Sequence, residues 1–122
     1  MKAKLMFAAL LSSMLAASEL AYGGGSWPSV TVIHLVPCSS EDTAICSTNG
    51  MVQVEFSANG TGGPSCGSGF KGWAAINITT SSGQALYAAI LMARVAGLTI
   101  TATGTGTCDV DTAMETLGYI NE

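Results

Sequence analysis

The sequence predicts one small domain that is mainly β and contains a single helix. Short runs rich in β-branched residues alternate with turn-forming residues along the chain after position 23. One segment, 83–97, changes from a period of two to the 3.6-residue period of a helix. Four cysteines in a chain of 122 residues predict cross-links that stabilise a modest core.

Residues 1–23 are predicted to be a signal peptide. Lys2 and Lys4 provide the positive start, an apolar run follows at 5–17, and small residues permit cleavage after position 18 or 23. A retained membrane anchor is the alternative, but the run is shorter than the ~20 residues that span a bilayer, and Glu19 interrupts it. The mature domain is therefore expected to cover 24–122, secreted or in the periplasm.

The first half of the mature chain predicts two strands. The run 29–37, SVTVIHLVP, is the first, and Pro37 ends it. Turn formers at 38–50 predict a loop. The second strand, 51–57, alternates and is expected to be half buried. Its apolar face holds Val52, Val54 and Phe56, and its polar face holds Gln53, Glu55 and Ser57.

A glycine-rich connection at 60–72 leads to a third strand at 73–80. Ser81, Ser82 and Gly83 offer residues suited to a helix N-terminus, and Gly97 is placed to end the helix in a left-handed conformation. The face expected to pack on the sheet holds Leu86, Ala89, Ile90 and Ala93.

Two further strands follow the helix. In 98–108 the residues expected to face inward are Leu98, Ile100 and Ala102, with Thr99, Thr101 and Thr103 on the other face. An acidic turn at 109–111 then leads to a last strand, 114–120. The order β-β-β-α-β-β is that of the OB-fold, a small five-stranded, partly open barrel, and this is the predicted architecture. A single split α+β sheet is the alternative.

The charge of the chain argues against nucleic acid as a partner, and its cysteine spacing argues against zinc. The net charge is −4, and Lys71 and Arg94 are the only Lys or Arg residues after position 23, so no basic stripe is present to bind nucleic acid. Zinc is the alternative use of the cysteines. The chain has no C-x-x-C pair and one histidine, His34, so disulfides are expected instead, with no metal or cofactor.

Catalytic residues are not predicted. His34 lies within a strand, where a structural histidine is the expected interpretation. Asp109, Asp111 and Glu115 lack the spacing of a calcium loop and are expected to be solvated in a turn. The glycines of GTGTC, 104–108, lack the helix and lysine of a phosphate loop. They are expected instead where another backbone approaches a strand edge.

Two features favour binding. Trp27, Trp73, Tyr87 and Tyr119 are available to stack on a sugar, with burial in the core or an interface as the alternative. The helix is apolar nearly all round, which indicates burial on more than one side, one against the sheet and one against a second subunit. The predicted oligomer interface consists of Tyr87, Leu91, Arg94 and Val95. A monomer with an apolar surface helix is the alternative.

The second half of the chain resembles a known family. The resemblance covers about residues 64–120, and its first motif begins two residues earlier, at 62. In order along the chain, the motifs are GGPSC, a tryptophan-bearing strand, GQALYAAILMARVAG, GTGTC and ETLGYI. This pattern resembles small exported bacterial proteins grouped with the binding subunit of subtilase cytotoxin, which is similar to pertussis-type toxin binding subunits. The resemblance implies an OB-fold, often five subunits in a ring with helices lining the pore, and a shallow glycan pocket on the barrel. In the toxins a catalytic chain sits on the ring.

The resemblance also suggests pairings and site residues. It favours a Cys66–Cys108 disulfide, which leaves Cys38 and Cys46 to close a local loop. The family's pocket serine falls near Ser26, and together with the stacking candidates this gives a predicted glycan site of Ser26, Trp27, Trp73 and Tyr119. After the last cysteine the chain departs from the family, because it has DVDTAM where a tryptophan and a Gly-Asp-Thr turn are common.

The resulting prediction is a non-enzymatic, exported binding subunit that forms a homo-oligomer and recognises host glycans. The alternative is a secreted or periplasmic protein-interaction module of the same fold without a toxin partner. A small hydrolase is a third interpretation, with His34 and the acidic turn as its only candidates.

Overall fold

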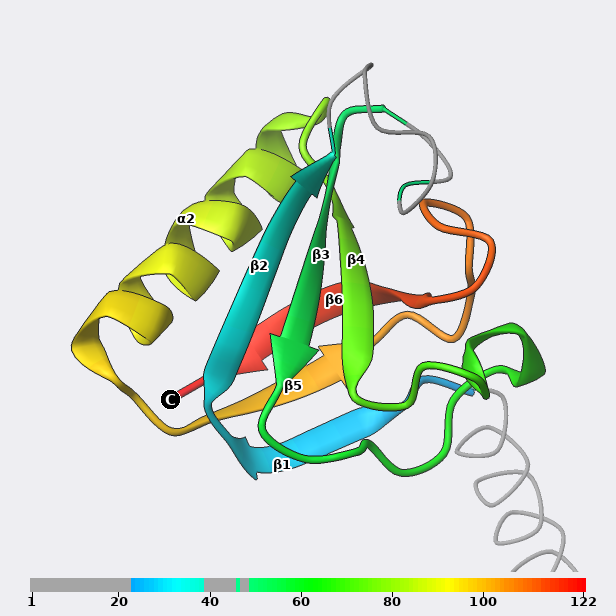
Figure 1. The fold of residues 1–122 in the computed structure, drawn as a ribbon, viewed down its shortest axis with the longest axis horizontal. Coiled ribbons are helices and arrows are strands. Elements are labelled where there is room, and N and C mark those ends of the chain that lie inside the picture. Colours follow the sequence, from blue (N-terminus) through cyan, green and yellow to red (C-terminus); the bar gives the residue numbers. More distant parts are fainter. Residues whose placement is uncertain (1–22, 39–45, 47–48) are drawn as a thin grey trace, which may run out of the picture.

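The structure is a computed structural model, and it describes residues 23–38, 46 and 49–122. The predicted signal peptide therefore lies outside the described residues, apart from Gly23. Six strands form one mixed sheet in the order β1-β5-β6-β4-β3-β2, in which only β4 and β6 are parallel (Figure 1). The elements are β1 (Ser26–Val30), β2 (Val32–Cys38), β3 (Met51–Phe56), the 3-10 turn η1 (Ser65–Gly67), β4 (Trp73–Asn77), α2 (Ser81–Ala96), β5 (Ile100–Gly104) and β6 (Glu115–Asn121). A mainly β domain with one α-helix is thus confirmed for the described part of the chain.

The first predicted strand is wrong in one respect, because the chain breaks it into two. The break is at Thr31, and two residues before it Ser29 has a φ of 52°, a left-handed conformation uncommon outside glycine, at an irregularity in the pairing of β1 with β5. The exposed backbone groups of Thr31 are satisfied by Ser57, whose Oγ accepts from Thr31 N (3.0 Å) and whose N–H donates to Thr31 O (2.9 Å). The sheet consequently has six strands where five were predicted.

The break places consecutive strands at opposite ends of the strand order. β1 pairs with β5, with Trp27 opposite Ala102, whereas β2 pairs with β3, with Leu35 opposite Val54. In Figure 1, β2, β3 and β4 stand side by side while β5, β6 and β1 run across them. The single residue Thr31 joins the two ends, so the sheet curls around its own inner face.

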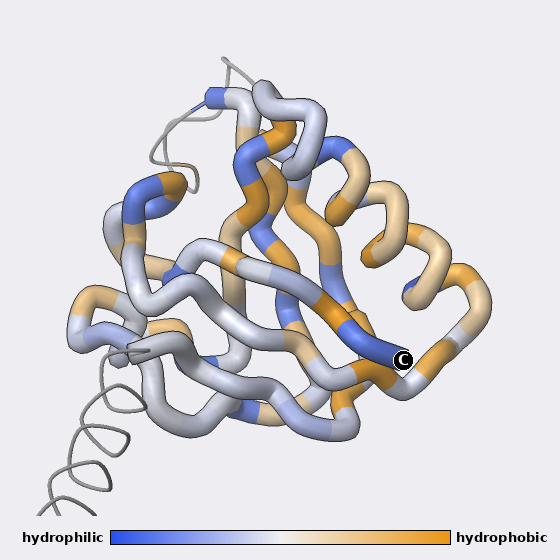
Figure 2. The backbone as a smooth tube through the Cα atoms, turned by 180° about the vertical axis from the view of Figure 1, so that it is seen from behind, coloured by the Kyte–Doolittle hydropathy of each residue, from blue (hydrophilic) through white to orange (hydrophobic). Residues whose placement is uncertain are grey.

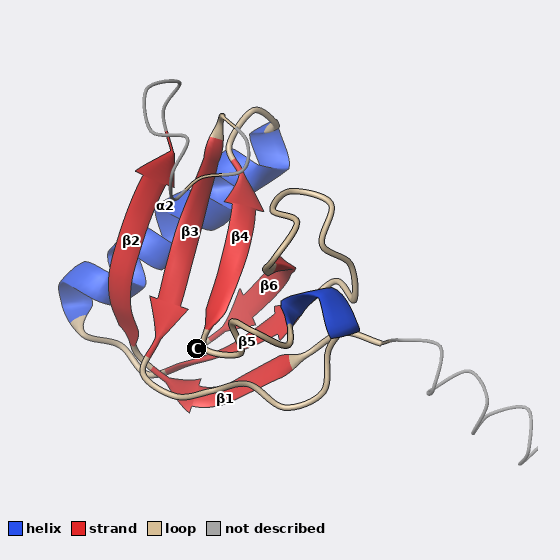
Figure 3. Cartoon of the chain, turned by 45° about the vertical axis from the view of Figure 1, so that its right-hand side comes forward, coloured by secondary structure: helices blue, strands red, loops and turns tan. Residues whose placement is uncertain are grey.

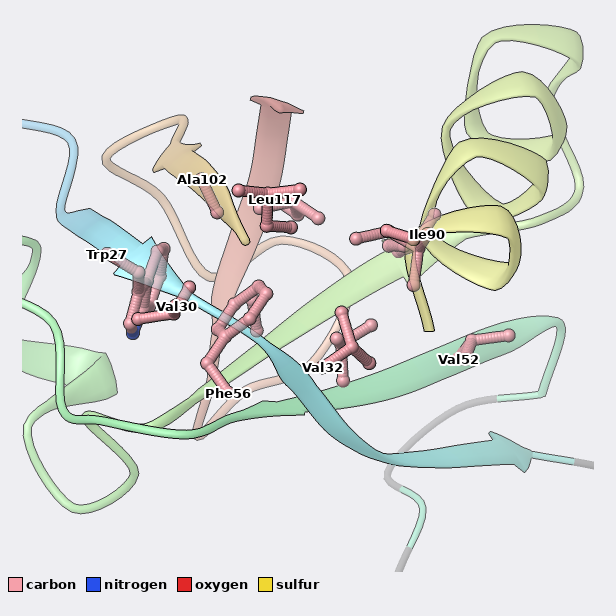
Figure 4. Packing of buried hydrophobic residues seen from close by; sticks show 13 residues of the cluster. Trp27, Val30, Val32, Val52, Phe56, Ile90, Ala102 and Leu117 are labelled. Atoms are coloured by element: carbon pink, nitrogen blue, oxygen red, sulfur yellow. The ribbon is translucent and has the colours of Figure 1, made fainter. Parts of the chain in front are cut away.

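One apolar core fills that inner face. It combines Trp27 and Val30 from β1 with Ile90 and Ala93 from α2. Figure 4 shows Trp27, Val30 and Ile90 converging with Phe56 and Leu117. The inward faces predicted for β3 and β5 are confirmed, since Val52, Val54, Phe56, Ile100 and Ala102 are all buried. Leu98, predicted to face inward, is instead 36% exposed because it precedes β5 in the link from the helix.

The polar face of β3 is less exposed than predicted. Gln53 is only 1% exposed, because a second apolar cluster of Cys38, Cys46, Met51, Ala75 and Met114 covers that side of the strand. Its amide Nε2 donates to Asp111 Oδ2 at 3.0 Å. The strand is therefore buried on both faces over most of its length.

The helix begins at Ser81, so its N-cap lies one residue before the candidates 81–83, and it ends at Gly97 as predicted. Thr80 is its N-cap, and the Thr80 hydroxyl accepts from Gly83 N at 3.1 Å. Gly97 ends it with a φ of 64°, and Leu98 N donates back to Ala93 O at 2.9 Å. Gly83, Ile90 and Ala93 are the buried positions, Leu86 is half buried, and Ala89 is exposed, against the prediction, because it turns away from β2, β4 and β6.

Both implied disulfides are present. Cys38 pairs with Cys46, and Cys66 pairs with Cys108, with Cα–Cα distances of 5.7 and 6.3 Å. Among the residues that the structure describes, no helix is long and apolar enough to cross a membrane.

Candidate ligand-binding site

The four residues of the predicted glycan site do not share one surface. Trp27 is 2% exposed; its ring lies 5.1 Å from that of Phe56, and its Nε1 donates to Lys71 O at 2.7 Å, so it is a core residue. Ser26 is half buried at the start of β1, and Trp73 is half buried at the start of β4. Tyr119 is 54% exposed on β6, opposite Thr103. The structure brings Trp27 and Trp73 to one hollow and leaves Tyr119 at another.

We call the first of these hollows the loop pocket. Residues from the glycine-rich segment 60–71 form most of its wall, and Gly25, Trp27, Trp73 and Glu115 complete it. Its volume is about 140 Å³. Phe70, 45% exposed, is the most open aromatic side chain of the lining, and it was not singled out from the sequence. The sequence did contain a signal for its exposure, because Phe70 lies in a glycine-rich loop and no periodic apolar pattern surrounds it.

Backbone hydrogen bonds at two places and one disulfide hold the wall of the loop pocket in place. Ser26 and Thr61 exchange two backbone hydrogen bonds of 2.9 Å, and Gly60 N donates to Lys71 O at 2.7 Å. η1, a short helical turn drawn in blue in Figure 3, carries Cys66, and the disulfide from Cys66 to Cys108 joins the wall to the segment after β5. Ser26 therefore supports the pocket through its backbone.

Glu115 lies at the base of the loop pocket and is not solvated, contrary to the prediction. It is 4% exposed, and its two carboxylate oxygens accept from Gly25 N at 3.0 and 2.9 Å, while Oε2 also accepts from Gly106 N at 2.8 Å. A Cβ on Gly104 would lie 2.0 Å from Oε2, and one on Gly63 would lie 2.7 Å from Oε1. The carboxylate thus occupies a space that only glycines can border.

These contacts explain the glycines of GTGTC. Gly104 N donates to Gly25 O at 2.8 Å, so the close approach of another backbone, predicted for this segment, is present. Gly25, Gly63, Gly104 and Gly106 all border or bond to the Glu115 carboxylate, although they are far apart in the chain. Their shared dependence on a single carboxylate could not be read from spacing alone.

The other two acids of the predicted turn differ from each other. Asp111 is 3% exposed, also against the prediction, and its Oδ1 accepts from Ala113 N at 2.8 Å in addition to the Gln53 bond. Asp109 is exposed as predicted. Its pKa lies below the ordinary value because the Thr107 hydroxyl donates to Oδ1, and Thr116 Oγ1 adds a weaker bond at 3.4 Å. Within the described ranges, no three His, Cys, Asp or Glu side chains are placed to hold a metal ion.

His34 is exposed on β2, opposite Glu55 of β3, and the two side chains form an ion pair of 2.5 Å when the histidine is protonated. Cross-strand pairs of this kind contribute to sheet pairing. The contact that the structure shows for the His34 side chain is this pairing with Glu55 across two strands.

Two further hollows, of about 310 and 410 Å³, are larger than the loop pocket. One is lined by Glu55, Asn59 and Ile33 together with Phe70, Lys71 and Trp73, which it shares with the loop pocket. The other lies beside Tyr119, between Thr103, Thr105 and Gly118. Phe70 and Tyr119 are thus the exposed aromatic rings at two separate candidate sites.

The predicted oligomer interface lies on one helix. Tyr87 is half buried against the core, whereas Leu91 is 38% exposed, Val95 is 88% exposed, and Arg94 is exposed. Met92, 71% exposed, extends this surface and was not among the predicted residues. Leu91, Met92 and Val95 form what we call the outer helix face, and Figure 2 shows the apolar colouring along this helix.

Comparisons of the chain with protein-family models, with curated proteins and with solved structures find no match.

Proposed function

We propose that the protein is an exported, non-enzymatic binding subunit with an OB-fold, which assembles with copies of itself and recognises glycans on host cells. Two exposed aromatic rings, Phe70 and Tyr119, each beside a hollow on a frame braced by two disulfides, carry the proposal. Sugar sites need such rings and a few placed polar groups on a rigid support.

The barrel assignment is supported by the strand order. If β1 and β2 are counted as the two halves of one bent strand, the sheet becomes a five-stranded closed arrangement in which β4 and β6 are parallel and α2 lies between β4 and β5. This arrangement is the one expected from the β-β-β-α-β-β order of an OB-fold.

Export is supported by the disulfides and by the predicted signal peptide. Both cysteine pairs are joined, and disulfides persist in the periplasm and outside the cell rather than in a reducing cytosol. The resemblance to toxin binding subunits adds a ring of five subunits and a separate catalytic chain to the proposal.

Two measurements on the oxidised protein test this function. A glycan array is expected to give reproducible binding to a restricted set of saccharides, and light scattering after size-exclusion chromatography is expected to give a multiple of the monomer mass. A monomer that binds no saccharide would contradict the proposal.

A protein-interaction module of the same fold is the second candidate. The outer helix face favours it, because three apolar side chains with Arg94 beside them suit a protein surface better than a sugar. Isolation of a stable complex with one different protein, lost on substitution of Val95 and formed without any glycan, would favour this function over the first.

A further inference from the structure

We infer that the loop pocket is the primary sugar subsite, and that it accepts an uncharged terminal hexose rather than a sialic acid. This inference rests on the proposed glycan-binding function and deepens it by naming the site and the class of sugar. Size, ring exposure and charge each support it.

The size of the loop pocket sets the size of its ligand. Its volume of about 140 Å³ is well below the ~300–1,000 Å³ of pockets that enclose drug-sized molecules. One monosaccharide ring therefore fills it, and further sugars of a glycan would lie outside. The neighbouring hollow shares Phe70, Lys71 and Trp73 with the pocket and offers Asn59 to a second sugar.

The wall of the pocket combines an apolar ring with hydroxyl groups. Phe70 is 45% exposed and offers its ring to the apolar C–H face of a hexose. Thr61, Ser65 and Ser68 line the same hollow and carry hydroxyls that can both donate and accept hydrogen bonds, as sugar hydroxyls do. The disulfide at Cys66 and the Ser26–Thr61 pairing keep this wall in place before a ligand arrives.

The charges of the pocket oppose an anionic ligand. A sialic acid carboxylate would need N–H donors or a cation, but the N–H groups of Gly25 and Gly106 already donate to the carboxylate of Glu115. Glu115 is buried at the base, where a second carboxylate would be repelled with little screening. Lys71 is the one cationic side chain of the lining and Glu115 the one acidic side chain, so their formal charges cancel and the pocket suits a ligand without net charge.

The experiment compares two exposed aromatic rings. Wild type, Phe70→Ala, Phe70→Leu and Tyr119→Ala are titrated with methyl glycosides of galactose, glucose and mannose, with lactose, and with 3′-sialyllactose, while backbone amide shifts are followed by NMR. Tyr119→Ala tests the competing candidate site, because Tyr119 is 54% exposed against 45% for Phe70 and lies at a different hollow. Amide spectra of each variant report whether it is folded.

We expect one neutral hexose to shift the amides of 60–71, and its affinity to fall about tenfold, equivalent to ~1.4 kcal/mol, in both Phe70 variants but not in Tyr119→Ala. Loss of hexose binding in Tyr119→Ala alone would move the site to the Tyr119 hollow and leave the proposed function intact. Stronger binding of 3′-sialyllactose than of lactose would overturn the charge argument. Failure of every saccharide, here and on the array, would instead reject the glycan function itself.

Discussion

At Glu115, one buried carboxylate joins the first described residues of the chain to the segment after β5. Three backbone hydrogen bonds from Gly25 and Gly106 reach it, and Gly63 and Gly104 make room for it. Hydrogen bonds to a buried charged group are stronger than those between neutral groups, and losing them leaves N–H groups without a partner. This side chain should therefore matter to stability as well as to the shape of the loop pocket.

Substitution of Glu115 by Gln keeps the shape of the side chain but places an NH₂ group against N–H donors. We expect the free energy of unfolding to fall by about 2 kcal/mol, the cost typical of losing charged hydrogen bonds in a buried site. Urea unfolding of the oxidised protein measures this. Glu122→Gln, at an exposed position, is the control and should stay within about 0.5 kcal/mol of wild type. Equal effects of the two substitutions would contradict the role given to Glu115.

Asp109 offers a test of local electrostatics. Because the Thr107 hydroxyl stabilises the charged carboxylate, the pKa of Asp109 is lowered in the folded protein. Its contribution to stability is then present above the ordinary Asp pKa of about 3.9 and is lost as the pH falls through the lower folded value. Thr107→Val should raise the Asp109 pKa toward the ordinary value, which an NMR titration of the carboxyl carbon reports. An unchanged titration would show that Thr107 is not the cause.

At the scale of elements, the ends of α2 depend on glycine for different reasons. Gly97 adopts a left-handed conformation, which the position after the last apolar period predicts. Gly83 is required by contact, since a Cβ there would lie 1.6 Å from Asn77 O at the end of β4. The requirement for glycine at 97 is local and can be predicted from the sequence, whereas the requirement at 83 depends on where β4 ends.

Gly83→Ala therefore reverses the usual helix rule. Alanine is ordinarily about 1 kcal/mol better than glycine in a helix interior. Here we expect a loss of about 2 kcal/mol in unfolding free energy, because the clash must be relieved by a backbone shift. Gly69→Ala is the control, since its Cβ would meet nothing within 4 Å. Thermal unfolding of both variants checks the prediction, and a stabilised Gly83→Ala protein would refute it.

The strands show the same division between local and distant causes. Alternation was sufficient to predict β3 within one residue and the inward residues of β5, because a period of two is a property of consecutive positions. It did not predict the division into β1 and β2 at Thr31, since the backbone of Thr31 bonds to Ser57, which is 26 positions away. It also missed the burial of Gln53 and Asp111, whose bond joins residues 58 positions apart.

At the scale of the whole molecule, the outer helix face is the surface through which copies of the chain are proposed to assemble. Val95 is 88% exposed and Met92 71%, so contiguous apolar side chains meet water in the isolated chain. Surfaces of this kind are commonly covered in an assembly.

Val95→Lys places a charge on that face without disturbing the core of the monomer. If copies of the chain assemble through α2, the variant should elute with the monomer mass under conditions in which wild type elutes as an oligomer. Light scattering measures both masses, and Ala58→Lys, an exposed position away from the helix, is the control. A wild-type oligomer that Val95→Lys leaves unchanged would exclude this face as the interface.

Local chemistry along the chain is enough to predict a mainly β domain, one apolar helix with its glycine end, and cysteines suited to disulfides, because these follow from residue periods, backbone preferences and composition. The tertiary structure alone decided that Trp27 belongs to the core, that Glu115 is buried among glycines, and that Phe70 opens onto a pocket. Each of these depends on contacts between segments far apart in sequence, which no local pattern records. The mainly β scaffold with one helix was therefore predictable, whereas the structure places Trp27 and Trp73 of the predicted site at the loop pocket with Phe70, and Tyr119 at a separate hollow.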